Sequence, residues 1–267
     1  MSISGYIRGQ YLQVAIPRQK KRILQKAPPE SLSRSSWEQS LSDPTQYYLE
    51  CFRFFHGRLP TELREHRAYF YAGRKGFGED SMHVMWWMLF NEFKPKNFLE
   101  IGVFRGQTLS LASLISRLLG NPCQVYGISP FISAGDAASL SLYPDLDYHT
   151  DTLANFEKFK LPRPELLKAF STDPKAVALI DSIAWDMIYI DGNHDYEVAR
   201  QDWEVCSRNI KPGGIIVLDD AGLTTSFRPT LFATGGHPGP SQLAQEIDRK
   251  QFREILQVGH NRVFQKI

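Results

Sequence analysis

The sequence predicts an α/β protein with a doubly wound, mostly parallel sheet and an N-terminal helical segment. Two observations lead to this fold class. Short strands that are apolar along their whole length alternate with helical stretches, and glycine or polar residues follow the strand ends. Such strands are typical of a parallel sheet covered on both faces, and the intervening helices imply right-handed crossovers. We therefore expect an arm and helical cap at residues 1–95 and a catalytic core at residues 96–267.

The first 95 residues carry fewer structural signals than the rest. Residues 1–44 are polar and basic, and we expect an irregular arm with one short helix there. Residues 45–55 are expected to be helical, as are residues 80–93, where the apolar sequence SMHVMWWMLFNEF ends before Lys94-Pro95. This second helix could line a substrate pocket, although packing against the sheet is the simpler role for its methionines and tryptophans.

The core begins with its most informative stretch, which is FLEIGVFRGQ at Phe98–Gln107. A strand carrying Glu100 leads into a turn with Gly102 and Gly106, and a helix is expected over Gln107–Leu119. Glycine adopts positive φ and lets a ligand approach the backbone, while the helix start offers unpaired N–H groups. The E-x-G-x-x-x-G spacing is one residue wider than the dinucleotide fingerprint. The stretch therefore predicts a ligand-binding turn.

Three further strands also end in residues that can do chemistry. A strand at 124–128 ends at Ser129, a strand at 185–190 ends at Asp191-Gly192-Asn193-His194, and a strand at 215–218 ends at Asp219-Asp220. A third strand is expected before residues 169–173. Because ligands gather at the carboxyl ends of parallel strands, we expect these residues and Glu100 to share one active site.

Composition excludes several classes of protein. The chain has 267 residues, 42% hydrophobic and 22% charged, with a net charge of +2 that is too small to indicate a nucleic-acid partner. No stretch approaches the ~20 apolar residues that span a bilayer, and the N-terminus lacks the layout of a signal peptide. The three cysteines have no metal-like spacing. We therefore expect a cytoplasmic protein that acts on a small molecule, without nucleic acid or membrane, and whether it is a homo-oligomer stays open.

The aspartates at the strand ends suggest a metal ion. Asp191, Asp219 and Asp220 would repel one another if they faced one space unpaired, and a hard divalent cation with oxygen ligands would relieve that repulsion. The alternative is that one aspartate caps a helix while another pairs with a basic residue.

These motifs together carry a family resemblance. The Phe98–Gln107 turn resembles motif I of the class I S-adenosylmethionine-dependent methyltransferases. Asp191-x-x-His194, upstream of Lys211-Pro212-Gly213-Gly214, four apolar residues and Asp219-Asp220, resembles the metal-dependent O-methyltransferases. Within these the chain is most similar to the macrocin-type sugar enzymes and more distantly to the catechol enzymes. The resemblance covers about half of the chain, and it implies a seven-stranded sheet, S-adenosylmethionine and Mg²⁺ (or Mn²⁺).

The resemblance also implies residue roles. It makes His194 the catalytic base, with Asp191 catalytic beside it. It implies cofactor contacts by Glu100, Gly102, Gly106, Thr108, Ser129, Ser171 and Asp191, and metal ligation by Asp191, Asp219 and Asp220.

One position departs from the family. The second strand usually ends in an acidic residue that binds the cofactor ribose, and this chain has Ser129 there. Either the Ser129 hydroxyl or Asp136 in the following loop could take that role. Ser171 and Thr172 lie where the family contacts adenine, and they could also cap the next helix.

The chemistry follows from what methyl transfer needs. The enzyme aligns an oxygen nucleophile behind the methyl carbon, a bound cation acidifies the acceptor hydroxyl, and His194 takes its proton. The alternative for His194 is a structural residue of its turn. The arrangement predicts an acceptor with two adjacent oxygens, such as a sugar diol or a catechol.

Other interpretations stay open at this point. An NAD-dependent oxidoreductase would have a tighter glycine turn and an acidic end to the second strand. A non-catalytic, methyltransferase-like binding module is consistent with Ser129 but leaves Asp191, His194, Asp219 and Asp220 unexplained. The glycine- and proline-rich loop at residues 222–242 could be a mobile lid or an inert surface loop.

Overall fold

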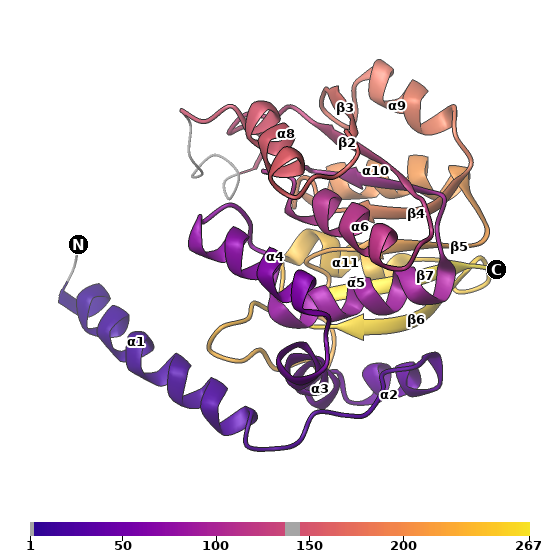
Figure 1. Ribbon diagram of the computed structural model, residues 1–267. Coiled ribbons are helices and arrows are strands. Elements are labelled where there is room, and N and C mark those ends of the chain that lie inside the picture. The colour runs from indigo at the N-terminus through magenta and orange to yellow at the C-terminus, as the bar shows by residue number, and fades with distance from the viewer. Residues whose placement is uncertain (1–2, 137–144) are drawn as a thin grey trace.

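A seven-stranded sheet with helices on both faces forms the centre of the computed structural model, which describes residues 3–136 and 145–267 (Figure 1). The strand order is β3-β2-β1-β4-β5-β7-β6. The first five strands run parallel, and β7 is antiparallel to both of its neighbours. The strands are β1 Asn97–Ile101, β2 Gln124–Ser129, β3 Glu165–Lys168, β4 Trp185–Ile190, β5 Ile210–Leu218, β6 Phe252–Val258 and β7 Asn261–Lys266.

The helices divide into a core set and a cap set. The core helices are α6 Gln107–Leu118, α8 Tyr148–Lys158, α9 Pro174–Asp181, α10 Tyr196–Asn209 and α11 Pro238–Glu246. The cap contains α1 Ile3–Ile23, the 3₁₀ turn η1 Arg34–Ser36, α2 Trp37–Ser42, α3 Pro44–Gly57, α4 Thr61–Ala72 and α5 Asp80–Phe93. The predicted fold class is confirmed, and the predicted helices over residues 45–55, 80–93 and 107–119 agree with α3, α5 and α6.

The side chains of β4 show how the sheet separates two hydrophobic clusters. Met187 and Tyr189 point toward the cluster that includes the cap helices and α6, whereas Ile188 and Ile190 point toward the cluster under α9, α10 and α11. All four side chains are buried. Alternating residues of a strand face opposite sides of a sheet, so a strand with both faces covered must be apolar throughout. The cap thus shares a hydrophobic core with the sheet. Helix α5 packs in this core, and some of its residues also line the site.

The N-terminal arm is the main correction to the sequence analysis. The structure has a 21-residue helix, α1, in place of an irregular arm, and it extends away from the sheet (Figure 1). Its C-terminal end docks on the body, because Gln19 Oε1 accepts a hydrogen bond from Leu231 N and Lys20 Nζ lies 4.8 Å from the Phe232 ring centroid. The prediction failed because the segment is polar and basic, and its Pro17 reads as a helix breaker. Within the described ranges, no helix has the length and apolar character needed to cross a membrane.

The order of the strands places the site. The chain runs from β1 outward through β2 to β3 and then returns to build β4 and β5 on the other side of β1. Helices therefore leave β1 and β4 toward opposite faces, and a crevice opens beyond the carboxyl ends of these two strands.

Candidate active site

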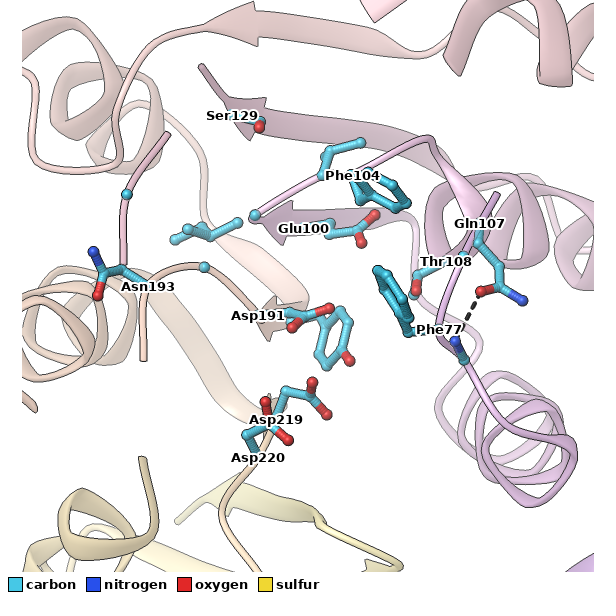
Figure 2. Close-up of a pocket in the computed structure, with 18 of the residues that line it drawn as sticks. Phe77, Glu100, Phe104, Gln107, Thr108, Ser129, Asp191, Asn193, Asp219 and Asp220 are labelled. Carbon is cyan, nitrogen blue, oxygen red and sulfur yellow. Dashed lines mark hydrogen bonds between the residues drawn. The ribbon is translucent and has the colours of Figure 1, made fainter. Parts of the chain in front are cut away.

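A cavity of about 530 Å³ lies beyond the carboxyl ends of β1, β2, β4 and β5 (Figure 2). Most of the predicted site residues line it, namely Glu100, Gly102, Thr108, Ser129, Ser171, Asp191, His194, Asp219 and Asp220. Gly106 is not among the lining residues. The structure therefore brings the predicted strand-end residues to one place.

Gly102 and Gly106 have different physical roles in the turn after β1. Gly102 has φ +98°, and a Cβ there would lie 1.8 Å from the backbone oxygen of Asp191. The ends of β1 and β4 thus touch through their backbones, which only glycine permits. Gly106 has φ +76° and precedes α6, and a Cβ on it would meet Thr152 of α8 at 2.6 Å. Gly106 therefore packs behind the cavity wall.

Glu100 is a buried carboxyl that faces the cavity from β1. It is 3% exposed and is hydrogen-bonded by the Leu109 backbone N–H and the Thr108 hydroxyl. Burial raises the pKa of Glu100 to about 8, with a smaller contribution from the charge of Asp219. Its Oε2 atom has no hydrogen-bond partner among the described residues. An unpaired buried acceptor at this position fits a ligand that brings a donor or a positive charge.

A loop of the cap closes this half of the cavity. The Gly78 N–H donates to Gln107 Oε1 at 2.9 Å (Figure 2), and a Cβ on Gly76 would come within 2.1 Å of the same oxygen. Phe77 stacks on Phe104 with ring centroids 5.3 Å apart. The cap is therefore fitted to the start of α6, and it supplies a wall that sequence reasoning did not predict.

Asp191 and Asp219 form a coupled pair at the ends of β4 and β5. Burial and the neighbouring Asp219 raise the pKa of Asp191 well above its usual range. Burial alone would also raise the pKa of Asp219, but the positive charge of His260, whose Nε2 lies 3.3 Å from Asp219 Oδ1, and the neighbouring Asp191 hold it below its usual value. The two carboxyls therefore titrate as a pair, in which the protonated form is favoured at Asp191 and the ionised form at Asp219, and a metal ion binding here would displace a proton from the pair.

His260 is a site residue that the sequence did not reveal. It follows Gly259 in the turn between β6 and β7, and its Nε2 lies 3.3 Å from Asp219 Oδ1. Its Nδ1 lies 3.2 Å from the backbone oxygen of Thr234. Burial by itself would lower the pKa of His260, but Asp219 raises it to about 10. No sequence motif surrounds His260. It reaches Asp191 and Asp219 because β7 returns antiparallel beside β5.

Glu79 adds a further buried carboxyl from the cap. It is 8% exposed, lines the cavity, and accepts a hydrogen bond from the Tyr48 hydroxyl at 2.6 Å. Burial raises its pKa, while His260 acts in the opposite direction. Helix α3 and the start of α5 are therefore tied to the same group of charges as β5.

The His194 ring lies between two carboxylates. Its Nε2 is 2.9 Å from Asp220 Oδ2, and its Nδ1 is 2.6 Å from Asp136 Oδ2, although the latter contact lacks the alignment of a hydrogen bond. Burial would lower the pKa of His194, but Asp220 and then Asp136 raise it to about 8. His237 stacks on the ring with centroids 4.1 Å apart.

The loop at residues 222–242 is part of the site wall, which rules out an inert surface loop. The His237 N–H donates to the backbone oxygen of Asp220 at 2.8 Å. A Cβ on Gly236 would lie 2.3 Å from that oxygen, and one on Gly239 would lie 2.2 Å from the oxygen of His194. Asp220 itself has φ +51°, a conformation that is uncommon outside glycine and found at functional sites.

The donor groups fit a divalent cation. Among the described residues, two sets have ligand atoms within 4.8 Å of one another: His194, Asp220 and His237, and Asp219, Asp220 and His260. Asp219 Oδ1 is buried and has no aligned hydrogen bond. Asp191 belongs to neither set and pairs with Asp219 instead. Carboxylate oxygens suit Mg²⁺, and the adjacent imidazoles extend the suitable ions to Mn²⁺.

Two smaller expectations have different outcomes. Asp136 does not line the cavity, and its carboxylate accepts a hydrogen bond from His194 N at 2.7 Å, so its contact with the ribose stays a prediction. The helix cap expected at Ser171 or Thr172 is wrong. Asp173 is the residue before α9, which starts at Pro174, and its carboxylate accepts from Phe170 N. Ser129 stays at the cavity, where its hydroxyl accepts from Phe131 N at 3.2 Å.

Comparison with known proteins agrees with this geometry. A family model described as a methyltransferase domain matches residues 99–221. An uncharacterized protein of Acanthamoeba polyphaga mimivirus is 27% identical over 127 residues, which are 46% of this chain and 50% of the viral protein. The chain thus spans about half the length of the curated relative that it matches.

Solved structures share the fold at low sequence identity. The O-methyltransferase from Bacillus cereus in complex with SAH aligns with a TM-score of 0.52 and 14% identity, over 86% of this chain and 99% of that chain. SAH-bound methyltransferase PaMTH1 of Podospora anserina aligns with a TM-score of 0.50 and 16% identity, over 78% of this chain and 88% of that chain. The strand order, the glycine turn after β1 and the family match lead to one conclusion: residues 99–221 form a class I methyltransferase domain, of the class that uses S-adenosylmethionine.

Proposed function

We propose that the chain is a divalent-metal-assisted O-methyltransferase that acts on a hydroxyl of a small molecule such as a sugar or a glycosylated natural product. The observation that carries this proposal is the meeting of His194, Asp219 and Asp220 in the same cavity as the glycine turn after β1.

The residues around the turn fit the methyl donor. Glu100 and the backbone at Gly102 would hold its methionine end, since Glu100 offers an unpaired buried oxygen to the ammonium group. Ser129 would contact the ribose, and Ser171 would lie against the adenine. S-adenosylmethionine supplies an electrophilic methyl group, so the main task of the protein is to orient the acceptor oxygen.

The carboxylates after β5 fit the ion. Asp219 and Asp220 would hold it, and Asp191 would be a further ligand once it is deprotonated. A bound Mg²⁺ or Mn²⁺ lowers the pKa of a coordinated hydroxyl. Two adjacent acceptor oxygens fit such a site better than one, and this favours a vicinal diol.

His194 is the proposed base. Its Nε2 lies beside Asp220, and this atom would receive the proton of the acceptor hydroxyl. His237, stacked on the ring, restricts its rotation. The backbone contacts of Gly239 and His237 keep the loop against both His194 and Asp220.

Methyl transfer from radiolabelled S-adenosylmethionine to a panel of sugar diols, glycosides and catechols tests the proposal. We expect turnover with a diol, its loss in excess EDTA and its recovery with Mg²⁺ or Mn²⁺. Asp219→Ala should abolish turnover while S-adenosylhomocysteine still binds by calorimetry. Asp181→Asn, an exposed aspartate in α9, is the matched control and should be active.

Full turnover in EDTA would remove the ion from the mechanism. Cofactor binding without turnover on any acceptor of the panel would favour the non-catalytic binding module.

A further inference from the structure

We propose that Lys75 and Arg105 together bind the carboxylate of the cofactor's methionine portion, so that the loop at residues 73–79, between α4 and α5, belongs to the cofactor site. The inference rests on the part of the proposed function that places this methionine portion beside Glu100. An amino acid carries a carboxylate next to its ammonium group, so a site for the ammonium group calls for a nearby cation as well.

The two cations come from distant segments and line the same cavity as Glu100. Lys75 lies in the loop at residues 73–79, and Arg105 lies in the turn after β1. Their side chains are 19% and 10% exposed. Each lies within two positions of one ring of the stacked pair Phe77 and Phe104, and these rings lie near the Glu100 carboxyl (Figure 2). The cations therefore flank the end of the cavity at which Glu100 offers its unpaired oxygen.

Asp151 of α8 is shared between the two cations. Its Oδ1 lies 2.9 Å from Lys75 Nζ, and its Oδ2 accepts a hydrogen bond from Arg105 Nε. Among the described residues, Asp151 is the one carboxylate that pairs with either cation, and residues 1–2 and 137–144 contain no Asp or Glu. Two positive charges thus share one negative charge. At positions with little access to water, such an excess of positive charge favours the binding of an anion.

The contacts around Asp151 hold both side chains in place before a ligand arrives. Lys75 Nζ gives two of its three N–H donors to Asp151 and to Asn155 Oδ1, the latter at 3.2 Å, and its third donor has no acceptor within the described ranges. Arg105 Nη1 donates to the backbone oxygen of Arg74 at 3.3 Å. Because the cations are already ordered, binding a carboxylate costs little side-chain entropy.

The simpler role for these contacts is structural, because Asp151 also ties the loop at residues 73–79 to α8. A structural support would favour every ligand of the cavity to the same extent. A carboxylate site instead distinguishes two ligands that differ only in that carboxylate. Selectivity between two such ligands therefore separates the two roles.

Calorimetry on the full-length chain compares two probes. They are S-adenosylhomocysteine and its decarboxylated analogue, which keeps the amine but lacks the carboxylate. The variants are Lys75→Met and Arg105→Gln. Lys158→Met is the control for Lys75, because Lys158 Nζ lies 5.9 Å from the same Tyr69 ring that Lys75 approaches to 5.4 Å, yet Lys158 is not among the lining residues. Arg117→Gln, in α6 and also outside the lining, is the control for Arg105.

We expect the wild type to bind S-adenosylhomocysteine at least tenfold more tightly than the analogue. Each variant should lose about tenfold in affinity for S-adenosylhomocysteine and change less than threefold toward the analogue, because the lost charge-assisted contact involves only the carboxylate. Both controls should keep the wild-type affinities. Thermal unfolding without ligand checks that the variants fold, and if Arg105→Gln does not, the more exposed Lys75 decides the question alone.

Three results would overturn the inference. Equal losses for both probes would make the cations structural supports of the loop. Equal affinities of the wild type for both probes would show that no carboxylate is recognised. Unchanged affinity for S-adenosylhomocysteine in both variants would remove the cations from the cofactor site, and a raised KM for an acidic acceptor would then assign them to the acceptor.

Failure of the proposed function appears differently. Turnover in excess EDTA, or no turnover on any acceptor, leaves the calorimetry unaffected, because neither the ion nor the acceptor takes part in it. A wild type that binds neither probe would remove the cofactor from the cavity, and the inference would fall with it.

Discussion

In both halves of the cavity a glycine allows a close contact with a backbone oxygen, although the surrounding sequences differ. The cofactor half is the side at the turn after β1, where we propose that S-adenosylmethionine binds, and there Gly102 lets the turn touch the backbone oxygen of Asp191. The acceptor half is the side at the loop after β5, where we propose that the acceptor binds, and there Gly236 lets the loop touch the backbone oxygen of Asp220. In both places glycine has positive φ beside an aspartate that ends a strand.

The halves differ in whether the glycine lies next to regular secondary structure. Gly102 directly follows a regular strand and precedes a regular helix, so its role is legible as a motif. Gly236 lies 16 positions after Asp220, in a loop whose path has no period. The role of a glycine can therefore be predicted from the sequence when a strand and a helix flank it. It cannot be predicted when the glycine lies in an irregular loop and only the tertiary structure shows its contact.

The largest expected effect breaks the cofactor half. Gly102→Ala places a Cβ at 1.8 Å from a backbone oxygen at φ +98°, and neither strand end can shift easily. We expect a loss of unfolding free energy of about 4 kcal/mol or more. Gly120→Ala is the control, because its φ is +62° with nothing within 4 Å, and it should lose about 1 to 2 kcal/mol. Urea unfolding measures both, and equal losses would remove the backbone contact as the cause.

A second test concerns the buried charge of the cofactor half. The folded pKa of Glu100, about 8, lies above the ordinary value of 4.5. Its contribution to stability is therefore present below about pH 4.5 and is lost as the pH rises through 8. Glu100→Gln should gain stability over the wild type by up to about 5 kcal/mol at pH 9 and little at pH 4. Urea unfolding at both pH values checks this, and a gain independent of pH would contradict it.

A third test separates the halves. Gly236→Ala should cost about 2 kcal/mol of stability, because its loop can shift away from Asp220 more easily than two strands can separate. S-adenosylhomocysteine affinity, measured by calorimetry, should change less than threefold, whereas methyl transfer should fall at least tenfold. The control is Gly213→Ala, with φ +77° in open space. Loss of cofactor affinity in Gly236→Ala would show that the halves are not separable.

The smallest effect is expected at the mouth of the cavity. Phe77 is 66% exposed and stacks on Phe104, so Phe77→Ala should cost no more than about 1 kcal/mol of stability. Because Phe77 lines the cavity, S-adenosylhomocysteine affinity should fall about two- to fivefold. Tyr71→Ala, an equally exposed aromatic of the cap outside the lining, should leave the affinity unchanged. The same affinity in both variants would exclude the loop from cofactor binding.

The sequence by itself determined the parallel sheet, the alternation of its parallel strands with helices, and the placement of Glu100, Ser129, Asp191 and Asp219 at one edge. These follow from local rules, since an apolar strand must be covered on both faces and the carboxyl ends of parallel strands coincide. The prediction of a class I methyltransferase is also confirmed, because the motifs that carry it lie at the ends of these strands. The ion, the base and the acceptor stay predictions.

Only the tertiary structure decided which groups pair within that edge. The coupling of Asp191 with Asp219, the contact of His260 with Asp219 and the contact of Asp136 with His194 each join segments that are distant in the sequence. The docking of α1 on residues 231 and 232 is of the same kind. Such pairings depend on the relative positions of strand ends to within an ångström or two. The hydrophobic periodicity of a sequence predicts the elements but carries no information at that scale.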